Sequence, residues 1–410
     1  MPIYKRFSTP ILLAYCTNVH PGESPEEVIS SLTQYTLPLK KRLVPEHPMA
    51  LGLRLGGAAV RALTETRRAI EPFRAFIRGT GLLPFTLNAF PYGDFHSKRV
   101  KETVFEPTWL DDERVLYTTR AARVLAALIG EGETGSLSTH TGAYRSDGNQ
   151  VEVKEGLLHN LIRVVSSLHA LQRESGKTIV LCLEPEPFST LESTEEVVDF
   201  FQEHLFLEGP AILAEETGMD PRRAEEVIWT HMGVCFDTCH LSVQFEDLRD
   251  AARLYRTKGI RIGKVQISNA LELQDPGKNP EGVEALRRFQ EEKYLHQVIG
   301  RGLRGRRMRS PDLDDLFGGS LKKWLKLEKW RVHYHVPLTW DSVPPLSTTR
   351  KDVANVIPYI LEENLCQHFE IETYTWGVLP DQKDQDLVTA LEEEFQWVDG
   401  IFKKAGWNQI

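Results

Sequence analysis

Acidic side chains stand at the ends of three short apolar runs in this sequence. The run 178–184 ends at Glu184, the run 233–237 ends at Asp237, and the run 368–374 carries Glu372. Carboxylate oxygens are preferred ligands of divalent cations such as Mg²⁺ and Mn²⁺, and zinc and cobalt accept them together with imidazole. Carboxylates gathered without a cation would repel one another and raise one another's pKa. We therefore expect Glu184, Asp237 and Glu372 to hold a divalent metal.

Other polar residues follow similar runs and could complete such a site. Gln266 offers an amide oxygen, and the spacing Asp237-x-x-His240 lets His240 reach back over the site from the following loop. The remaining candidates are His20 as an extra ligand, Asn88 and His140 as substrate contacts, and Trp376 as a surface on which a sugar or base could stack. Trp376 could equally serve only to pack the rim.

Short strand-like runs alternate with longer amphipathic segments along the whole chain, which calls for a parallel sheet with helices outside. The predicted strands are 11–17, 50–55, 84–90, 136–141, 178–184, 233–237, 263–268, 331–336 and 368–374. The predicted helices are 25–39, 58–80, 111–129, 154–175, 193–203, 247–257 and 353–363. Eight strand–helix units close a (β/α)8 TIM barrel, so one of the nine runs is surplus. We expect one domain over 1–410, with the surplus run in an enlarged insertion, 269–367, between the seventh and eighth strands.

In a parallel barrel the carboxyl ends of all strands open at the same face, so the polar residues named above would meet there. Glu184 and Glu186, like Glu370 and Glu372, are two residues apart and share one face of a strand. We favour Glu184 and Glu372 as the paired groups that touch metal and substrate. Glu186 and Glu370 are then supporting or salt-bridged neighbours.

Two further motifs each leave two interpretations open. His333 and His335 lie two residues apart, so both could face the metal pocket, or both could pack within an elaborated rim. Five arginines, at 301, 304, 306, 307 and 309, lie among glycines. They could form a solvated loop, or a cradle for the phosphate of a substrate, since guanidinium groups suit phosphate.

Composition narrows the class of protein. The 410 residues carry 49 basic and 58 acidic side chains, a net charge of −9, which disfavours a nucleic-acid partner. No apolar stretch approaches the ~18 residues of a membrane span. The five cysteines are odd in number and four sit in strand-like runs, which favours buried free thiols and a reducing cytoplasm. Cys235 and Cys239 flank Asp237, but they lack a usual zinc spacing.

The Glu-Pro at 184–185, the Asp-x-x-His at 237–240 and the final Glu372 together resemble the xylose-isomerase-like TIM barrel superfamily, which includes sugar isomerases, epimerases and endonuclease IV. The fragments 15–23, 183–187 with 233–240, and 368–376 resemble the EboE family of metabolite traffic proteins more closely. The resemblance implies a divalent-metal barrel in which Glu184, Asp237 and Glu372 are metal carboxylates. It places Gln266 where isomerases usually have His. His240 then matches a substrate contact of epimerases or a metal ligand of endonuclease IV, and His140 and His296 match further histidines of that nuclease. Asn88 departs from the nuclease, which has His there.

The sequence therefore predicts an enzyme that isomerises or epimerises a sugar or sugar phosphate by proton transfer next to a carbonyl. It would use Mn, Mg, Co or Zn as cofactor. Glu184 and Glu372 would exchange the proton, and His140 and His240 would position hydroxyl groups. One alternative is an endonuclease IV-like phosphoester hydrolase with two or three metals. The other is a barrel that binds a metabolite, which is polyhydroxylated or phosphorylated, without turning it over.

Overall fold

Eight parallel strands form the centre of the molecule. The structure is a computed structural model, and it describes residues 3–6, 9–145, 150–380 and 386–409. The barrel strands are β2 (Thr9–Tyr15), β3 (Met49–Arg54), β4 (Leu82–Asn88), β5 (Thr134–His140), β6 (Thr178–Glu184), β7 (Met232–Asp237), β8 (Ile262–Ile267) and β15 (His368–Ile371). Neighbours pair in parallel from β3 to β8, then through β15 to β2. A parallel bridge between Cys16 and Gly52 joins the two ends of this sheet.

The structure confirms the α/β fold class and the barrel. Each of the eight barrel strands lies within three residues of its predicted bounds, and 178–184 matches β6 at both ends. These strands could be predicted from the sequence because a parallel strand that is covered on both faces is a nearly continuous apolar run. In β3 and β7 every residue is buried.

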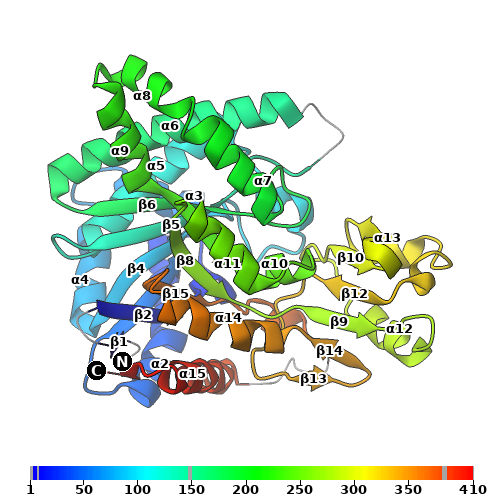
Figure 1. Ribbon diagram of the computed structural model, residues 1–410. Helices are drawn as coiled ribbons and strands as arrows, with labels where there is room; N and C mark the ends of the chain where they lie inside the picture. Colours follow the sequence, from blue (N-terminus) through cyan, green and yellow to red (C-terminus); the bar gives the residue numbers. More distant parts are fainter. Residues whose placement is uncertain (1–2, 7–8, 146–149, 381–385, 410) are drawn as a thin grey trace.

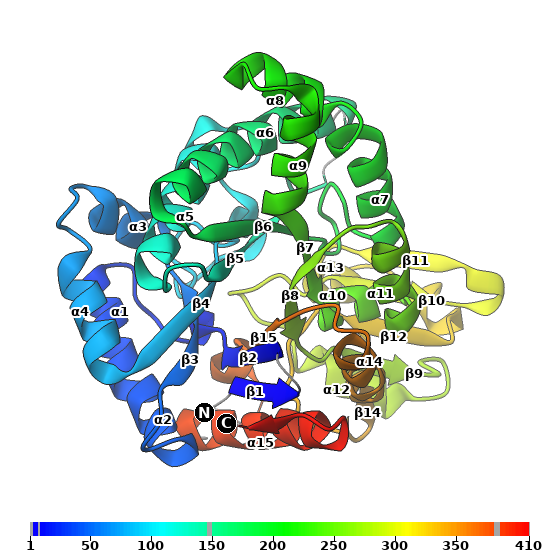
Figure 2. The same ribbon diagram turned by 60° about the vertical axis from the view of Figure 1, so that its left-hand side comes forward.

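Helices surround the barrel, as Figure 2 shows. They are α1 (Pro25–Ser31), α2 (Leu37–Leu43), α3 (Gly57–Thr64), α4 (Glu71–Thr80), α5 (Asp112–Leu128), α6 (Gln150–Ser175), α7 (Thr194–Asp199), α8 (Gly209–Thr217), α9 (Pro221–His231), α10 (Thr238–Val243), α11 (Leu248–Thr257), α14 (Arg350–Glu362) and α15 (Leu387–Lys404). Short helical turns are η1 (Thr17–Val19), η2 (Leu32–Thr36), η3 (Lys101–Phe105), η4 (Phe200–Leu205) and η7 (Thr375–Val378). The single helix predicted over 58–80 is wrong, since the segment forms two helices, α3 and α4, and Pro72 lies in the first turn of α4, where its missing N–H costs no hydrogen bond.

A second sheet occupies the chain between β8 and β15 and projects from one side of the barrel (Figure 1). Its strands run antiparallel in the order β11 (Arg307–Ser310), β10 (Val298–Arg301), β12 (Lys329–Val332), β9 (Leu271–Gln274), β14 (Leu346–Thr348) and β13 (Ser342–Val343). With it lie α12 (Pro280–Arg287), α13 (Leu313–Gly318), η5 (Leu303–Gly305) and η6 (Trp324–Lys326). The surplus run 331–336 therefore belongs to this sheet as β12, which ends at Val332.

The first and last described strands lie beside the barrel. Strand β1 (Ile3–Arg6) pairs antiparallel with both β2 and β16 (Asn408–Gln409), so the first and last described strands are neighbours. No helix among the described residues is long and apolar enough to cross a membrane. All five cysteines are buried and unpaired, as the sequence predicted.

The barrel interior contains a buried ion pair. Lys264 Nζ on β8 lies 2.6 Å from Glu370 Oε2 on β15, and neither side chain has any solvent exposure. Glu370 was one of the acids expected to be salt-bridged. Its side chain also explains Gly52 on β3, because a Cβ at that position would lie 1.9 Å from Glu370 Oε1.

We expect Glu394, on α15, to make stability depend on pH. Its Oε1 accepts hydrogen bonds from Leu338 N at 2.9 Å and Thr373 Oγ1 at 2.7 Å, and burial raises the pKa of Glu394 to about 7. The folded state therefore holds this proton more tightly than the unfolded state. The stabilisation is complete below pH ~4.5 and is lost as pH rises through about 7, a change of about 3 kcal/mol.

Glu394→Gln should remove this dependence. Relative to wild type, the variant should gain about 3 kcal/mol of unfolding free energy between pH 5 and pH 8, measured by urea denaturation. Glu215→Gln, at an exposed position on α8 far along the chain from Glu394, is the control and should leave the pH dependence of stability unchanged. Parallel pH profiles for Glu394→Gln and wild type would show that Glu394 does not hold a proton at neutral pH.

Candidate metal centre at the barrel mouth

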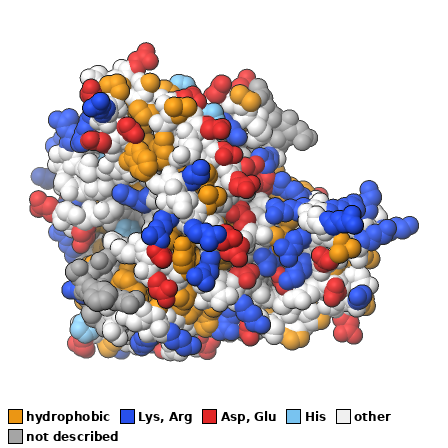
Figure 3. Space-filling model, viewed as in Figure 1, with side chains coloured by type: hydrophobic (Ala, Val, Ile, Leu, Met, Phe, Trp, Pro, Cys, Tyr) orange, Lys and Arg blue, Asp and Glu red, His pale blue; other side chains and the backbone are white. Residues whose placement is uncertain are grey.

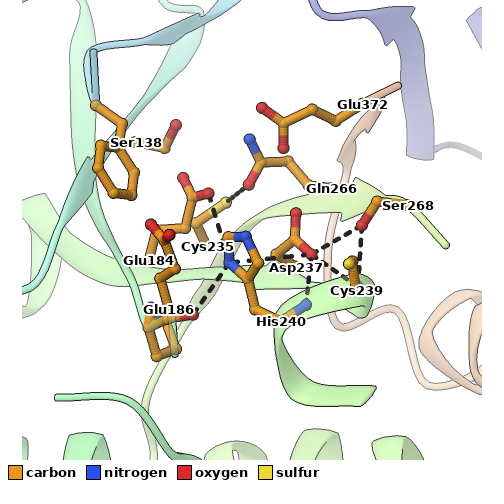
Figure 4. Close-up of polar contacts among 12 residues, drawn as sticks. Ser138, Glu184, Glu186, Cys235, Asp237, Cys239, His240, Gln266, Ser268 and Glu372 are labelled. Atoms are coloured by element: carbon orange, nitrogen blue, oxygen red, sulfur yellow. Dashed lines mark hydrogen bonds and ion pairs between the residues drawn. The ribbon is translucent and has the colours of Figure 1, made fainter. Parts of the chain in front are cut away.

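A pocket opens at the carboxyl ends of the barrel strands, where the sequence placed the site. It is lined by Asn18, Asn88, Phe90, Pro91, Phe95, Val100, Lys101, Val104, Glu184, Glu186, His240, Tyr294, Leu295, His333, His335, Glu372 and Tyr374. Barrel loops supply most of this lining, and the segment between β8 and β15 supplies the rest. Figure 4 shows Glu184, Asp237 and Glu372 converging from three parts of the barrel, with His240 beside them.

Glu184, Asp237 and Glu372 come together at the floor of the pocket. Glu184 ends β6, Asp237 ends β7 and Glu372 follows β15, and one ligand oxygen from each lies within 4.8 Å of the others. Among the described residues, Glu184 Oε2, Asp237 Oδ2 and Glu372 Oε2 have no hydrogen-bond partner. Burial, and then the neighbouring carboxylates, raise the pKa of Glu184 and Glu372 well above the usual range. A divalent cation bound by the free oxygens would relieve both costs.

In two of the three carboxylates, the other oxygen accepts hydrogen bonds from the protein. Glu372 Oε1 accepts from Asn18 Nδ2 at 2.8 Å and from Asn88 Nδ2 at 3.0 Å. Asp237 Oδ1 accepts from the backbone N–H groups of Cys239 and His240 and from Ser268 Oγ. One oxygen is thus fixed by the protein while the other stays available. Sequence reasoning missed Asn18, although it stands in the polar stretch after the first strand.

Three imidazoles form a second group beside the carboxylates. The Nε2 atoms of His240 and His333 are 3.1 Å apart, those of His333 and His335 2.9 Å, and those of His335 and His240 3.3 Å. His240 lies on α10, whereas His333 and His335 follow the end of β12. The two residues of the i, i+2 pair therefore share the face that lines the pocket, which is one of the two interpretations that the sequence left open.

The structure brings neither Gln266 nor His296 to this lining. Gln266 is buried on β8, where its Oε1 accepts from Cys235 Sγ at 2.9 Å. Both ring nitrogens of His296 face oxygen acceptors, since Nε2 is 2.7 Å from Glu291 Oε1 and Nδ1 is 3.0 Å from the backbone oxygen of His333. His296 thereby supports the segment that carries His333.

Of the other predicted residues, Asn88 and His240 line the pocket and three do not. His20 bonds Tyr15 through Nε2 at 2.8 Å and stacks on Tyr35. His140 packs against Phe90 and Phe105, and Trp376 is buried in η7. The aromatic side chains that reach the pocket are Phe90, Phe95, Tyr294 and Tyr374. Tyr374 is only two residues from Trp376, and no pattern in the sequence separates the two.

The spacing of the cysteines disfavoured Cys239 as a ligand, yet the structure places it near the imidazoles. Its sulfur lies within 4.8 Å of ligand nitrogens of His333 and His335. The arginines at 301–309 lie elsewhere, on the β10–β11 hairpin of the projecting sheet, and none lines the pocket. Figure 3 shows basic side chains gathered on that projection. Arg309 binds Glu192, and Arg304, Arg306 and Arg307 are exposed.

Comparison with known proteins agrees with this architecture. Neither a known family nor a curated protein matches the sequence. Among solved structures, a xylose isomerase-like TIM barrel protein from Mycobacterium smegmatis has a TM-score of 0.50 and 12% identity, over 96% of this chain and 97% of that one. A D-tagatose 3-epimerase-like protein has a TM-score of 0.49 and 12% identity, with 97% and 98% covered. A xylose isomerase domain protein from Alicyclobacillus acidocaldarius has 0.46 and 13%, with 96% and 99% covered. The likeness to the M. smegmatis protein agrees with the TIM barrel fold seen in this chain.

Proposed function

We propose that this protein is a divalent-metal-dependent isomerase or epimerase of a sugar or sugar phosphate. The observation that carries the proposal is the group formed by Glu184, Asp237 and Glu372, in which each carboxylate keeps one unpaired oxygen at the barrel mouth. The M. smegmatis barrel of the same fold is described in complex with magnesium, which supports a divalent cation here.

The cation and the residues of the pocket would have different parts in the reaction. A bound divalent cation would polarise a substrate carbonyl and offset the negative charge that develops on it. Glu184 and Glu372 both line the pocket, so one would accept the proton next to the carbonyl and the other would return it. Asn18 and Asn88 hold Glu372 in place, and Phe95 and Tyr374 offer apolar surface to a sugar ring.

A solvent-exchange screen tests this function. The protein is incubated in D₂O with sugars and sugar phosphates, each with Mn²⁺, Mg²⁺, Co²⁺ or Zn²⁺, and deuterium on substrate carbon is followed by NMR. We expect deuterium to appear at a carbon next to the carbonyl of one substrate class, and to stop appearing after chelation. Metal binding without exchange for any substrate would favour a metabolite-binding barrel instead, of the kind that the EboE resemblance suggests.

One observation favours a second candidate, a phosphoester hydrolase of the endonuclease IV type. The three imidazoles beside the carboxylates add the nitrogen ligands that a site with several metals needs. Against it stand the net charge of −9 and the arginines at 301–309, which lie outside the pocket. Hydrolysis of an abasic-site oligonucleotide is the discriminating assay.

We also propose that 269–367 belongs to the same functional unit as the barrel, since His333 and His335 line its pocket.

A further inference from the structure

His240, His333 and His335 converge on one point at the edge of the pocket. Their three Nε2 atoms form a triangle with sides of 2.9, 3.1 and 3.3 Å. All three side chains are at least 95% buried, and all three line the pocket. The carboxylate group that carries the proposed function includes none of them.

The opposite nitrogen of each ring fixes its tautomer. His240 Nδ1 faces the backbone oxygen of Pro185 at 3.2 Å, and His335 Nδ1 faces that of Glu372 at 2.9 Å. A carbonyl oxygen can only accept, so these Nδ1 atoms carry the hydrogen.

His333 follows the same rule through Gln297. Gln297 Nε2 donates to Glu186 Oε1 and to the backbone oxygen of Pro187. These bonds orient the amide so that Gln297 Oε1 faces His333 Nδ1 at 2.5 Å. The amide oxygen accepts, so His333 also carries its hydrogen on Nδ1.

Three bare Nε2 lone pairs therefore point at one another. A hydrogen bond between two of these rings would need one Nε2–H, and the Nδ1 of that ring would then set a lone pair against an oxygen. A cation among the three nitrogens removes the repulsion.

The spacing fits a first-row transition metal. Tetrahedral zinc binds imidazole nitrogens at about 2.0–2.1 Å, which puts two such nitrogens roughly 3.3 Å apart. Neutral imidazoles whose Nδ1–H groups are held by oxygen acceptors are also the usual state of zinc-binding histidines. The triangle in this protein is slightly tighter, as expected for ligands that could move outward on binding.

We infer that His240, His333 and His335 bind a zinc-type ion that is distinct from the ion of the carboxylate group. Asp237 lies next to both groups, since its carboxylate is within 4.8 Å of ligand nitrogens of His240 and His335 and also of the Glu184 and Glu372 oxygens. Its unpaired Oδ2 can complete the zinc site or link the two ions. This inference holds whether or not the proposed isomerisation is correct.

Metal analysis of the whole chain tests it. Protein stripped with a chelator is dialysed against Zn²⁺, and bound metal is counted by elemental analysis. Co²⁺ loading is followed by the visible absorption of four-coordinate cobalt. We expect His333→Asn/His335→Asn to lose one zinc ion per chain and the cobalt absorption. Glu184→Gln/Glu372→Gln can lose only the ion of the carboxylate group, so it should keep one zinc ion per chain and the cobalt absorption. His231→Asn is the matched control, because it removes a buried histidine whose Nδ1 also faces a backbone oxygen, that of Ile179.

Unchanged zinc content and cobalt absorption in His333→Asn/His335→Asn would overturn the inference. So would their loss from the carboxylate variant alone. X-ray absorption of zinc-loaded wild type covers the case in which a histidine variant fails to fold. A nitrogen shell with imidazole scattering supports the assignment, and a shell of oxygens alone contradicts it. None of these readouts needs a substrate, so a failed exchange screen would count against the proposed function only.

Discussion

Replacing Glu184 with glutamine should lower the rate of solvent-hydrogen exchange into substrate by at least about 100-fold. Glutamine keeps the size of the side chain but has no ionisable proton, and its amide is a poorer metal ligand than a carboxylate. Glu184 lies within 4.8 Å of Asp237 and Glu372, so the change weakens metal binding as well as proton transfer. The expected result is therefore a lower rate at saturating substrate and a weaker affinity for Mn²⁺, measured by calorimetry.

The control is Glu195→Gln, which changes an exposed acid in the first turn of α7 and should alter neither quantity. If Glu184→Gln bound Mn²⁺ like wild type and kept its exchange rate, neither role that we assign to Glu184 would stand.

Replacing Lys264 with methionine should destabilise the fold by about 3–5 kcal/mol. The ammonium of Lys264 lies 2.6 Å from Glu370 Oε2 and donates to Ser138 Oγ at 3.2 Å, with no exposure to water. Without it, Glu370 would be a buried carboxylate with no counter-charge, close to Glu184 and Glu372. Urea denaturation at pH 7 measures the loss.

Two further variants isolate the ion pair. Arg253→Met removes the partner of Asp250 in a pair whose side chains are about two-thirds exposed, and it should cost less than about 1 kcal/mol. Lys264→Met/Glu370→Leu removes both buried charges and should recover much of the lost stability. If Lys264→Met were no more destabilising than Arg253→Met, the buried pair would not be needed for the stability of the barrel.

Sequence patterns predicted the barrel because its strands have a distinctive composition. Strands such as β6 and β7 are buried on both faces, so they read as unbroken apolar runs that end at a polar residue. The projecting sheet lacked this signal. Its strands have only two to four residues each, too short for a pattern, and they are defined by pairing with segments far away in the sequence.

The histidines show the same limit at the site. His296 and His333 stand in similar surroundings in the sequence, each next to a run that forms a strand of the projecting sheet. Only packing distinguishes them, since His296 turns both nitrogens to oxygen acceptors and His333 turns Nε2 toward His240 and His335.

The amino-acid sequence by itself determined the barrel, the face on which its polar residues gather and the convergence of Glu184, Asp237 and Glu372. Those features follow from local composition and from the rule that parallel strands end at a common edge. Only the tertiary structure decided that His333 and His335 meet His240, and that Asn18 and Asn88 hold Glu372. Such contacts join residues far apart along the chain, and their partners are set by how the projecting sheet packs over the barrel mouth, which no local pattern records.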